Sequence, residues 1–216
     1  MKNFKLIPTL LLALASIVNL NAQDATPTFQ EFLAQFPKAA LPFSFDAQEL
    51  QVQLEARPAT KSARLGWEYY QFLPELERSA SYSNMPVCPE PVAAFETAEY
   101  TAVLYNIARG FSRGTKSYSV SVFSKQGEYI GTHFVAGVNP ETLTVATINE
   151  TLIASVNEYK VNWANNYRES GYIGNKVTGL TLIESTTLEL TSAGNPDHIQ
   201  WSSRSMDTSA DLAKIK

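Results

Sequence analysis

The chain has 216 residues, 17 of them basic and 21 acidic, and its formal net charge is −4. Nucleic acid and anionic lipid both select a basic surface, so this balance argues against either as the main partner. The one cysteine, Cys88, excludes an internal disulfide, and the core must therefore stabilise the fold unaided. Cys88 lies among prolines with no basic neighbour, which favours a buried small hydrophobe over a nucleophile.

The first 22 residues have the layout of a secretory signal peptide. Lys2 and Lys5 give a basic start, residues 6–18 are mostly apolar, and a short polar run ends at Ala22. The apolar run of about 13 residues is too short for a membrane anchor, which needs roughly 20. We therefore expect cleavage after Ala22 and an exported protein, periplasmic or secreted.

The rest of the chain suits one globular domain. Residues 23–200 have the length of an ordinary domain, and residues 201–216 are a polar tail. No apolar run of about 18 residues follows the leader, so we expect no transmembrane segment in the mature chain. The leader contains two lysines and no acid, so its removal changes the net charge from −4 to about −6.

Two helices are predicted near the start of the mature chain. Thr28 and Glu31 have capping-box spacing, and Pro37 ends the run. The apolar positions of this run share one helical face, which should pack across a sheet: Phe29, Phe32, Leu33 and Phe36. A second helix is predicted over residues 63–73.

The segment between these helices is ambiguous, and the next one is rich in proline. In residues 43–56, Leu50, Val52 and Leu54 alternate with polar residues, which favours a turn followed by a strand. Asp46 followed by Glu49 also fits a helix start. Residues 79–91 are predicted to form an ordered loop.

From about residue 99 onward the sequence predicts strands separated by turns. The predicted strands cover residues 101–107, 117–122, 129–135, 143–148, 152–163 and 177–191. In residues 117–122 serines alternate with apolar residues, which predicts one solvent-exposed and one buried face of the sheet. The fold class is therefore mainly β (α+β): a curled antiparallel meander of about six to eight strands, with one or two N-terminal helices packed on it.

Enzymatic and metal motifs are weak. Residues 110–114 match G-x-S-x-G, but a strand-like segment follows where a hydrolase has a helix, so a glycine-rich hairpin loop is the better interpretation. Two distant histidines, His133 and His198, make no metal-ligand spacing. We predict no catalytic residue, metal or cofactor, and we expect His133 to be half-buried on a strand.

An aromatic segment is the best candidate for a binding site. Aromatic rings next to planar amides and charges are typical of sugar sites and of protein interfaces. The candidate ligand-binding residues are Tyr159, Trp163, Asn166, Tyr167, Arg168 and Tyr172. The alternative is that Tyr159 and Trp163 pack as ordinary strand residues beside a polar loop.

Two segments near the N-terminus and one hairpin resemble those of other proteins. Residues 28–37, Leu41-Pro42-Phe43 and the hairpin around residues 125–128 are similar to small exported proteins of unknown function from Bacteroidetes-type bacteria. The likeness extends over about two-thirds of the mature chain. It implies compartment and fold, and it brings no activity or functional residue.

The leading hypothesis is a non-enzymatic exported protein that binds a ligand or another protein. A glycan, a lipid or an envelope protein are the candidate partners, and nucleic acid is not. One alternative is a hydrolase of an envelope or extracellular polymer, with Glu96, Glu99 or Glu158 in acid–base roles. Another is a structural envelope component, which would need an exposed apolar patch.

Overall fold

The fold is built on one antiparallel sheet. The computed structural model describes residues 26–55, 63–74, 76, 88–108, 116–171 and 174–193. The predictions for the leader, for residues 110–114, for Tyr172, for His198 and for the tail concern residues outside these ranges.

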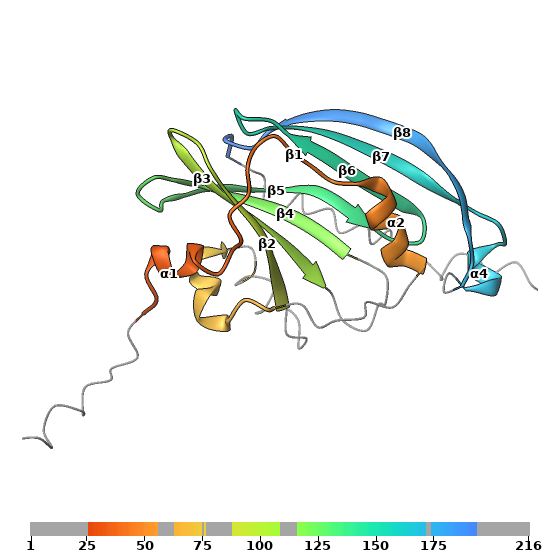
Figure 1. The fold of residues 1–216 in the computed structure, drawn as a ribbon, viewed down its shortest axis with the longest axis horizontal. Coiled ribbons are helices and arrows are strands. Elements are labelled where there is room, and N and C mark those ends of the chain that lie inside the picture. Colours follow the sequence, from red (N-terminus) through yellow and green to blue (C-terminus); the bar gives the residue numbers. More distant parts are fainter. Residues whose placement is uncertain are drawn as a thin grey trace, which may run out of the picture.

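Among the described residues the sheet has eight strands, and seven of them lie in chain order (Figure 1). That order is β2-β3-β4-β5-β6-β7-β8, with every pairing antiparallel. The predicted meander is confirmed. The strand bounds are β1 Phe43–Ser44, β2 Cys88–Glu96, β3 Tyr100–Ala108, β4 Lys116–Ser124, β5 Tyr129–Val138, β6 Thr142–Ile148, β7 Ile153–Trp163 and β8 Val177–Glu189.

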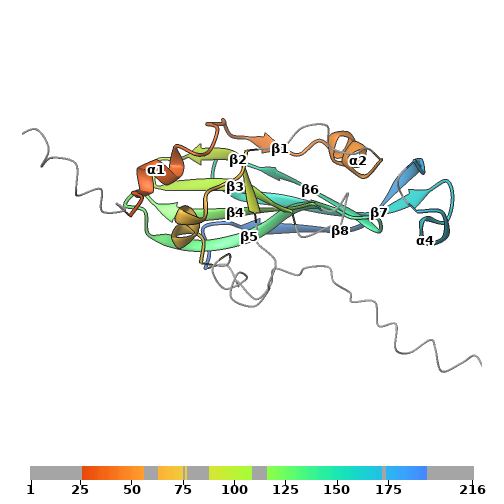
Figure 2. The same ribbon diagram turned by 90° about the horizontal axis from the view of Figure 1, so that it is seen from below.

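A strap of chain (residues 37–45) links two distant parts of the sheet. Within the described residues β5 and β6 pair at two positions, next to their shared turn, and β1 pairs with the far end of β6 instead. At its other end the strap meets the outer edge of β2, where the Ala39 N–H donates to the Ala94 carbonyl at 2.9 Å. The strap therefore connects the far end of β6 with the edge strand β2 (Figures 1 and 2).

The inner core is the larger of two apolar clusters, and strands β2 to β8 all contribute to it. Phe43 and Phe45 of the strap pack against it, with their rings 5.3 and 5.1 Å from those of Phe95 and Tyr118. Its largest fully buried side chains include Phe95, Leu104, Leu143, Ile148 and Leu152.

The outer core covers the opposite face of β3. Helix α1 (Phe29–Leu33) and the 3₁₀ helix η1 (Trp67–Phe72) pack there, and Phe32 is fully buried. Both halves of the capping box at Thr28 and Glu31 are present, as predicted. The predicted helix over residues 63–73 is confirmed in part, because the structure has a shorter 3₁₀ helix there. The outer core consists of Phe32, Phe36, Leu65, Leu73, Leu76, Ala94, Val103, Tyr105, Ile107 and Phe123.

A glycine in the β4–β5 turn lets α1 approach the sheet. Gly127 has φ +88°, a conformation that L side chains rarely adopt. A Cβ atom at this position would also lie 2.9 Å from the ring of Phe29. The turn conformation and the close helix contact both require glycine.

The preference for a strand in residues 43–56 was wrong. These residues form the two-residue β1 and then helix α2 (Ala47–Glu55). Asp46 caps the helix, since its Oδ1 accepts from the Gln48 N–H at 2.7 Å. The apolar alternation did not predict burial either, because Leu50 is buried while Val52 is 56% exposed.

The face of β4 that carries the serines is buried, so the prediction that this face is exposed to solvent was wrong. Ser119 and Ser121 are both buried because α1 and η1 cover this side of the sheet. Buried hydroxyls need partners, and Ser121 has them: its Oγ lies 2.9 Å from the Tyr105 hydroxyl and 2.6 Å from Thr132 Oγ1.

The expected loop over residues 79–91 is a strand where the structure describes it. Pro89 and Pro91 belong to β2, the first strand of the meander. Proline lacks an N–H donor, so it is tolerated at a sheet edge or beside a bulge. Here the register shifts between Pro91 and Ala93. The predicted burial of the Cys88 thiol concerns a side chain outside the described part.

Candidate binding site

The candidate site lies where the β5–β6 turn meets the loop after β7. Helix α4 (Tyr167–Ser170) forms this loop at the far end of β7 and β8 (Figure 1). Asn166 caps the helix, because its Oδ1 accepts from the Arg168 N–H at 3.1 Å. Its Nδ2 donates to Glu169 Oε1 at 2.8 Å. The cap fixes the direction in which Tyr167 and Arg168 project.

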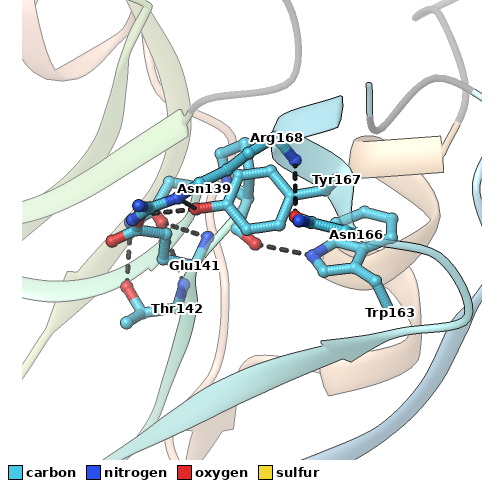
Figure 3. A network of polar contacts seen from close by, with 8 residues as sticks. Asn139, Glu141, Thr142, Trp163, Asn166, Tyr167 and Arg168 are labelled. Atoms are coloured by element: carbon cyan, nitrogen blue, oxygen red, sulfur yellow. Dashed lines mark hydrogen bonds and ion pairs between the residues drawn. The ribbon is translucent and has the colours of Figure 1, made fainter. Parts of the chain in front are cut away.

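The opposing β5–β6 turn is held by Asn139. Its Oδ1 accepts from the N–H groups of Glu141 and Thr142 at 2.8 and 2.9 Å. Its Nδ2 donates to Thr142 Oγ1 at 2.8 Å (Figure 3). An Asn side chain that replaces backbone partners in this way stabilises a tight turn. The turn presents the Glu141 carboxylate to α4.

One carboxylate oxygen joins the turn to α4. Glu141 Oε1 accepts from the Tyr167 hydroxyl at 2.5 Å and from Arg168 Nη2 at 2.8 Å. Arg168 Nε also donates to the Tyr167 hydroxyl at 3.2 Å, which closes a three-residue cluster (Figure 3). We call Glu141, Tyr167 and Arg168 the clip.

The clip is electrostatically balanced. Burial, together with the hydrogen bond and charge of Glu141, raises the pKa of the Tyr167 hydroxyl, while the hydrogen bond and charge of Arg168 oppose this shift. The hydrogen bonds to Tyr167 and Glu141 raise the pKa of the Arg168 guanidinium. Tyr167 is therefore a neutral donor at pH 7, and the charge of Arg168 is matched by that of Glu141.

Trp163 extends the aromatic surface. Its indole Nε1–H donates to the Pro140 carbonyl at 2.7 Å, so it contacts the same turn as the clip. The rings of Trp163 and Tyr167 lie 6.2 Å apart at 42°, and both side chains are half-buried (Figure 3). The Arg168 guanidinium carbon lies 5.9 Å from the centroid of the Tyr167 ring, so the two rings and the guanidinium are neighbours.

The structure brings together four of the six predicted site residues: Trp163, Asn166, Tyr167 and Arg168. Tyr159 and Trp163 both pack against the inner core, as the alternative of ordinary strand residues expected, and Tyr159 lies in the middle of β7 opposite Leu182 of β8. Asn139 and Glu141 were not among the predicted site residues, because they lie more than 20 residues before α4 in the chain. The sequence shows the Asn139-Pro140 turn, but it does not show that this turn contacts α4.

The carboxylates considered for hydrolysis do not form one cluster. Glu96 ends β2, where it pairs with Lys38 and Lys125 at 3.7 and 3.9 Å. Glu99 follows in the exposed β2–β3 turn. Glu158 is on β7, directly opposite Glu184 of β8.

The histidine prediction is confirmed. His133 is half-buried on β5, and its Nε2 lies 3.2 Å from the Ser192 carbonyl oxygen after β8. Burial lowers the pKa of the ring below its ordinary value of 6.5. In the part of the chain that the structure describes, no three His, Cys, Asp or Glu residues are grouped so that they could hold a metal ion.

Comparison of the chain with known protein families, with curated proteins and with solved structures finds no match. Within the described ranges, no helix has the length and apolar character needed to cross a bilayer.

Proposed function

We propose that the protein is a non-enzymatic exported binding protein and that it binds a neutral glycan on the surface formed by Trp163, Tyr167 and Arg168. The observation that carries the proposal is the clip, in which Glu141 joins a half-buried tyrosine ring to an arginine whose side chain is 73% exposed. Side chains ordered in advance lose less conformational freedom when a ligand binds. An aromatic ring face packs against the apolar face of a sugar, as it does in other amphipathic contacts.

The charge balance favours a neutral ligand over a polyanion. The cation of Arg168 is paired with Glu141, and Glu169 accepts from Asn166. An anionic polymer would have to compete with Glu141 for the guanidinium. Uncharged hydroxyls can use the edges of these groups without breaking the pair.

Purified residues 23–216 should be screened against an array of neutral and acidic glycans, and hits should be measured by calorimetry. Tyr167→Ala should weaken binding of a neutral glycan at least tenfold, since it removes the ring. Tyr167→Phe keeps the ring and leaves the Arg168–Glu141 pair in place, so it should stay within about threefold, a difference worth less than about 1 kcal/mol.

The matched control is Trp67→Ala, because Trp67 is the most exposed of the large apolar side chains that the structure describes, at 82%, and lies on η1. It should bind like the parent protein. Equal loss in Trp67→Ala and Tyr167→Ala would indicate nonspecific adhesion to aromatic side chains. Binding to acidic glycans alone would also contradict the proposal.

Export rests on the N-terminal sequence and needs its own test. Expression of the full chain in a Gram-negative host, followed by fractionation and N-terminal sequencing, should yield a product that begins near Gln23 outside the cytoplasm. An uncleaved product that remains in the cytoplasm would contradict it.

A second candidate function, a hydrolase, rests on Glu158 and Glu184. Directly opposed residues on antiparallel strands have Cβ atoms about 4.5–5.5 Å apart, which can place two carboxyl groups at the spacing of glycosidase pairs, ~5–9.5 Å. The register also shifts next to Glu158, and β-bulges are frequent beside active sites. Turnover of a bound glycan that Glu158→Gln abolishes would favour this candidate. Unchanged glycan after prolonged incubation would exclude it.

A further inference from the structure

A second polar cluster lies on the inner face of β2, β3 and β4, away from α4. Asn106 of β3 is paired in register with Glu90 of β2 and with Tyr118 of β4. Directly opposed residues project from the same face of a sheet, and so do residues two apart along a strand. Lys116 therefore shares this face. The same face contributes Leu104 and Tyr118 to the inner core.

The cluster contains an unusual buried acceptor. Asn106 is 2% exposed, and its Nδ2 donates to Glu90 Oε2 at 2.8 Å. Its Oδ1 accepts no hydrogen bond, and it is the one buried side-chain polar atom without a partner among the residues that the structure describes. Folded proteins rarely leave such an atom uncompensated. A missing N–H or O–H donor is the simplest explanation.

The charged groups beside Asn106 are partly exposed. Lys116 Nζ lies 3.9 Å from Glu90 Oε2, too far for a hydrogen bond, and the side chains are 24% and 15% exposed. Lys116 can therefore donate to a further acceptor. Glu90 and Lys116 together carry no net charge, and a ligand that enters a partly buried site should add none, because an unpaired charge there is costly.

We propose that Glu90, Asn106 and Lys116 bind a small molecule of zero net charge that has an N–H donor next to an oxygen acceptor. The donor is bound by Asn106 Oδ1 together with the Glu90 carboxylate, and the acceptor is bound by Lys116. A primary amide has this pattern in uncharged form, and the zwitterion of an α-amino acid has it in charged form. Both ligands complete the hydrogen bonding of the Asn106 amide.

The location fits a small ligand. The cluster lies at the end of the sheet where β2 begins, β3 ends and β4 begins (Figure 1). Opposite Lys116 is Val138, the last residue of β5 and a member of the inner core. Small-molecule sites are lined mainly by apolar residues with a few polar groups among them.

Thermal unfolding of residues 23–216 should be followed with acetamide and glycine, with ethylamine and acetate as single-group controls. At about ten times the Kd, a ligand of the proposed class stabilises the fold by RT ln 11 and should raise the Tm by about 3–6 °C. A rise with acetamide alone identifies an amide ligand, and a rise with glycine alone identifies a zwitterion. No rise with either compound, or an equal rise with ethylamine or acetate, overturns the proposal.

Variants test whether the Tm rise depends on Asn106 and Lys116. Lys116→Met should abolish the Tm rise, and so should Asn106→Leu, which replaces the amide with an apolar group of similar size. If Asn106→Leu does not fold, the ¹⁵N-labelled parent protein gives the same information, because the Asn106 side-chain N–H resonances should shift on titration. Retention of the full Tm rise in Lys116→Met, or no shift of these resonances, overturns the proposal.

The matched control is Glu96→Gln, at the other end of β2, where the carboxylate is exposed and paired with Lys38 and Lys125. It should keep the full Tm rise, whereas Glu90→Gln should lose it. Tyr167→Ala should also keep it, so the result does not depend on the glycan proposal. An equal Tm rise in Glu90→Gln and Glu96→Gln would contradict a specific site at Glu90.

Discussion

Phe32→Ala tests whether the outer core stabilises the whole fold. Phe32 is fully buried, and its ring lies close to the following five rings, at centroid distances of 4.9 to 6.3 Å: Phe29, Phe36, Tyr69, Phe72 and Phe123. Helix α1 has five residues and cannot be stable alone, so its place depends on this packing.

The expected loss can be estimated from the burial of this side chain. A buried phenylalanine removes at least ~150 Å² from water, and at about 25 cal/mol per Å² this area is worth about 4 kcal/mol. Measured Phe→Ala substitutions in cores cost ~3–5 kcal/mol, in agreement with this figure. We expect the free energy of unfolding to fall by about 3–5 kcal/mol in urea titrations followed by tryptophan fluorescence and circular dichroism.

Val52→Ala is the control, because Val52 is an exposed apolar residue on α2. It should change the free energy of unfolding by no more than about 0.5 kcal/mol. A loss below about 1 kcal/mol in Phe32→Ala would refute the conclusion that α1 is integral to the fold.

Three further predictions concern single side chains. Glu184→Gln should raise the free energy of unfolding by ~0.2–1 kcal/mol, because it removes a like charge opposite Glu158, and a loss would show that the carboxylates do not repel. His133→Gln should flatten the pH dependence of the free energy of unfolding. The half-buried ring resists protonation, so the parent protein should lose stability as the pH falls below about 6.5, and an equal slope in the variant would contradict this. Asp46→Ala should lower stability by about 1 kcal/mol through loss of the α2 cap, and urea titration showing no change would mean that the cap is not needed.

The sequence was sufficient for six of the seven strands of the meander and for the start of α1. Period-two alternation and turn residues identified six strands, and the structure pairs them in chain order. Thr28 and Glu31 identified the helix start because a capping box consists of contacts between neighbours in the chain. Such features depend on residues a few positions apart, and a sequence displays them directly.

The sequence predicted the residues of the candidate site that lie on and beside α4, but not those of the β5–β6 turn. Trp163, Asn166, Tyr167 and Arg168 lie within six positions and could be grouped by composition. Glu141, which orders two of them, belongs to a turn that the sheet brings near α4. The pairing of Glu158 with Glu184 and the missing partner of Asn106 likewise depend on the register of strands.

Which surfaces are buried was decided by tertiary structure. The serines of β4 alternate as a solvent-facing set does, yet α1 and η1 cover them, because β3 and β4 pack on both faces. Residues 43–56 alternate as a strand does, yet Asp46 and the position of Leu50 against the inner core make residues 47–55 a helix. Local pattern determined where the strands lie along this chain. What each strand faces depended on elements distant in sequence, because burial is a property of the assembled layers.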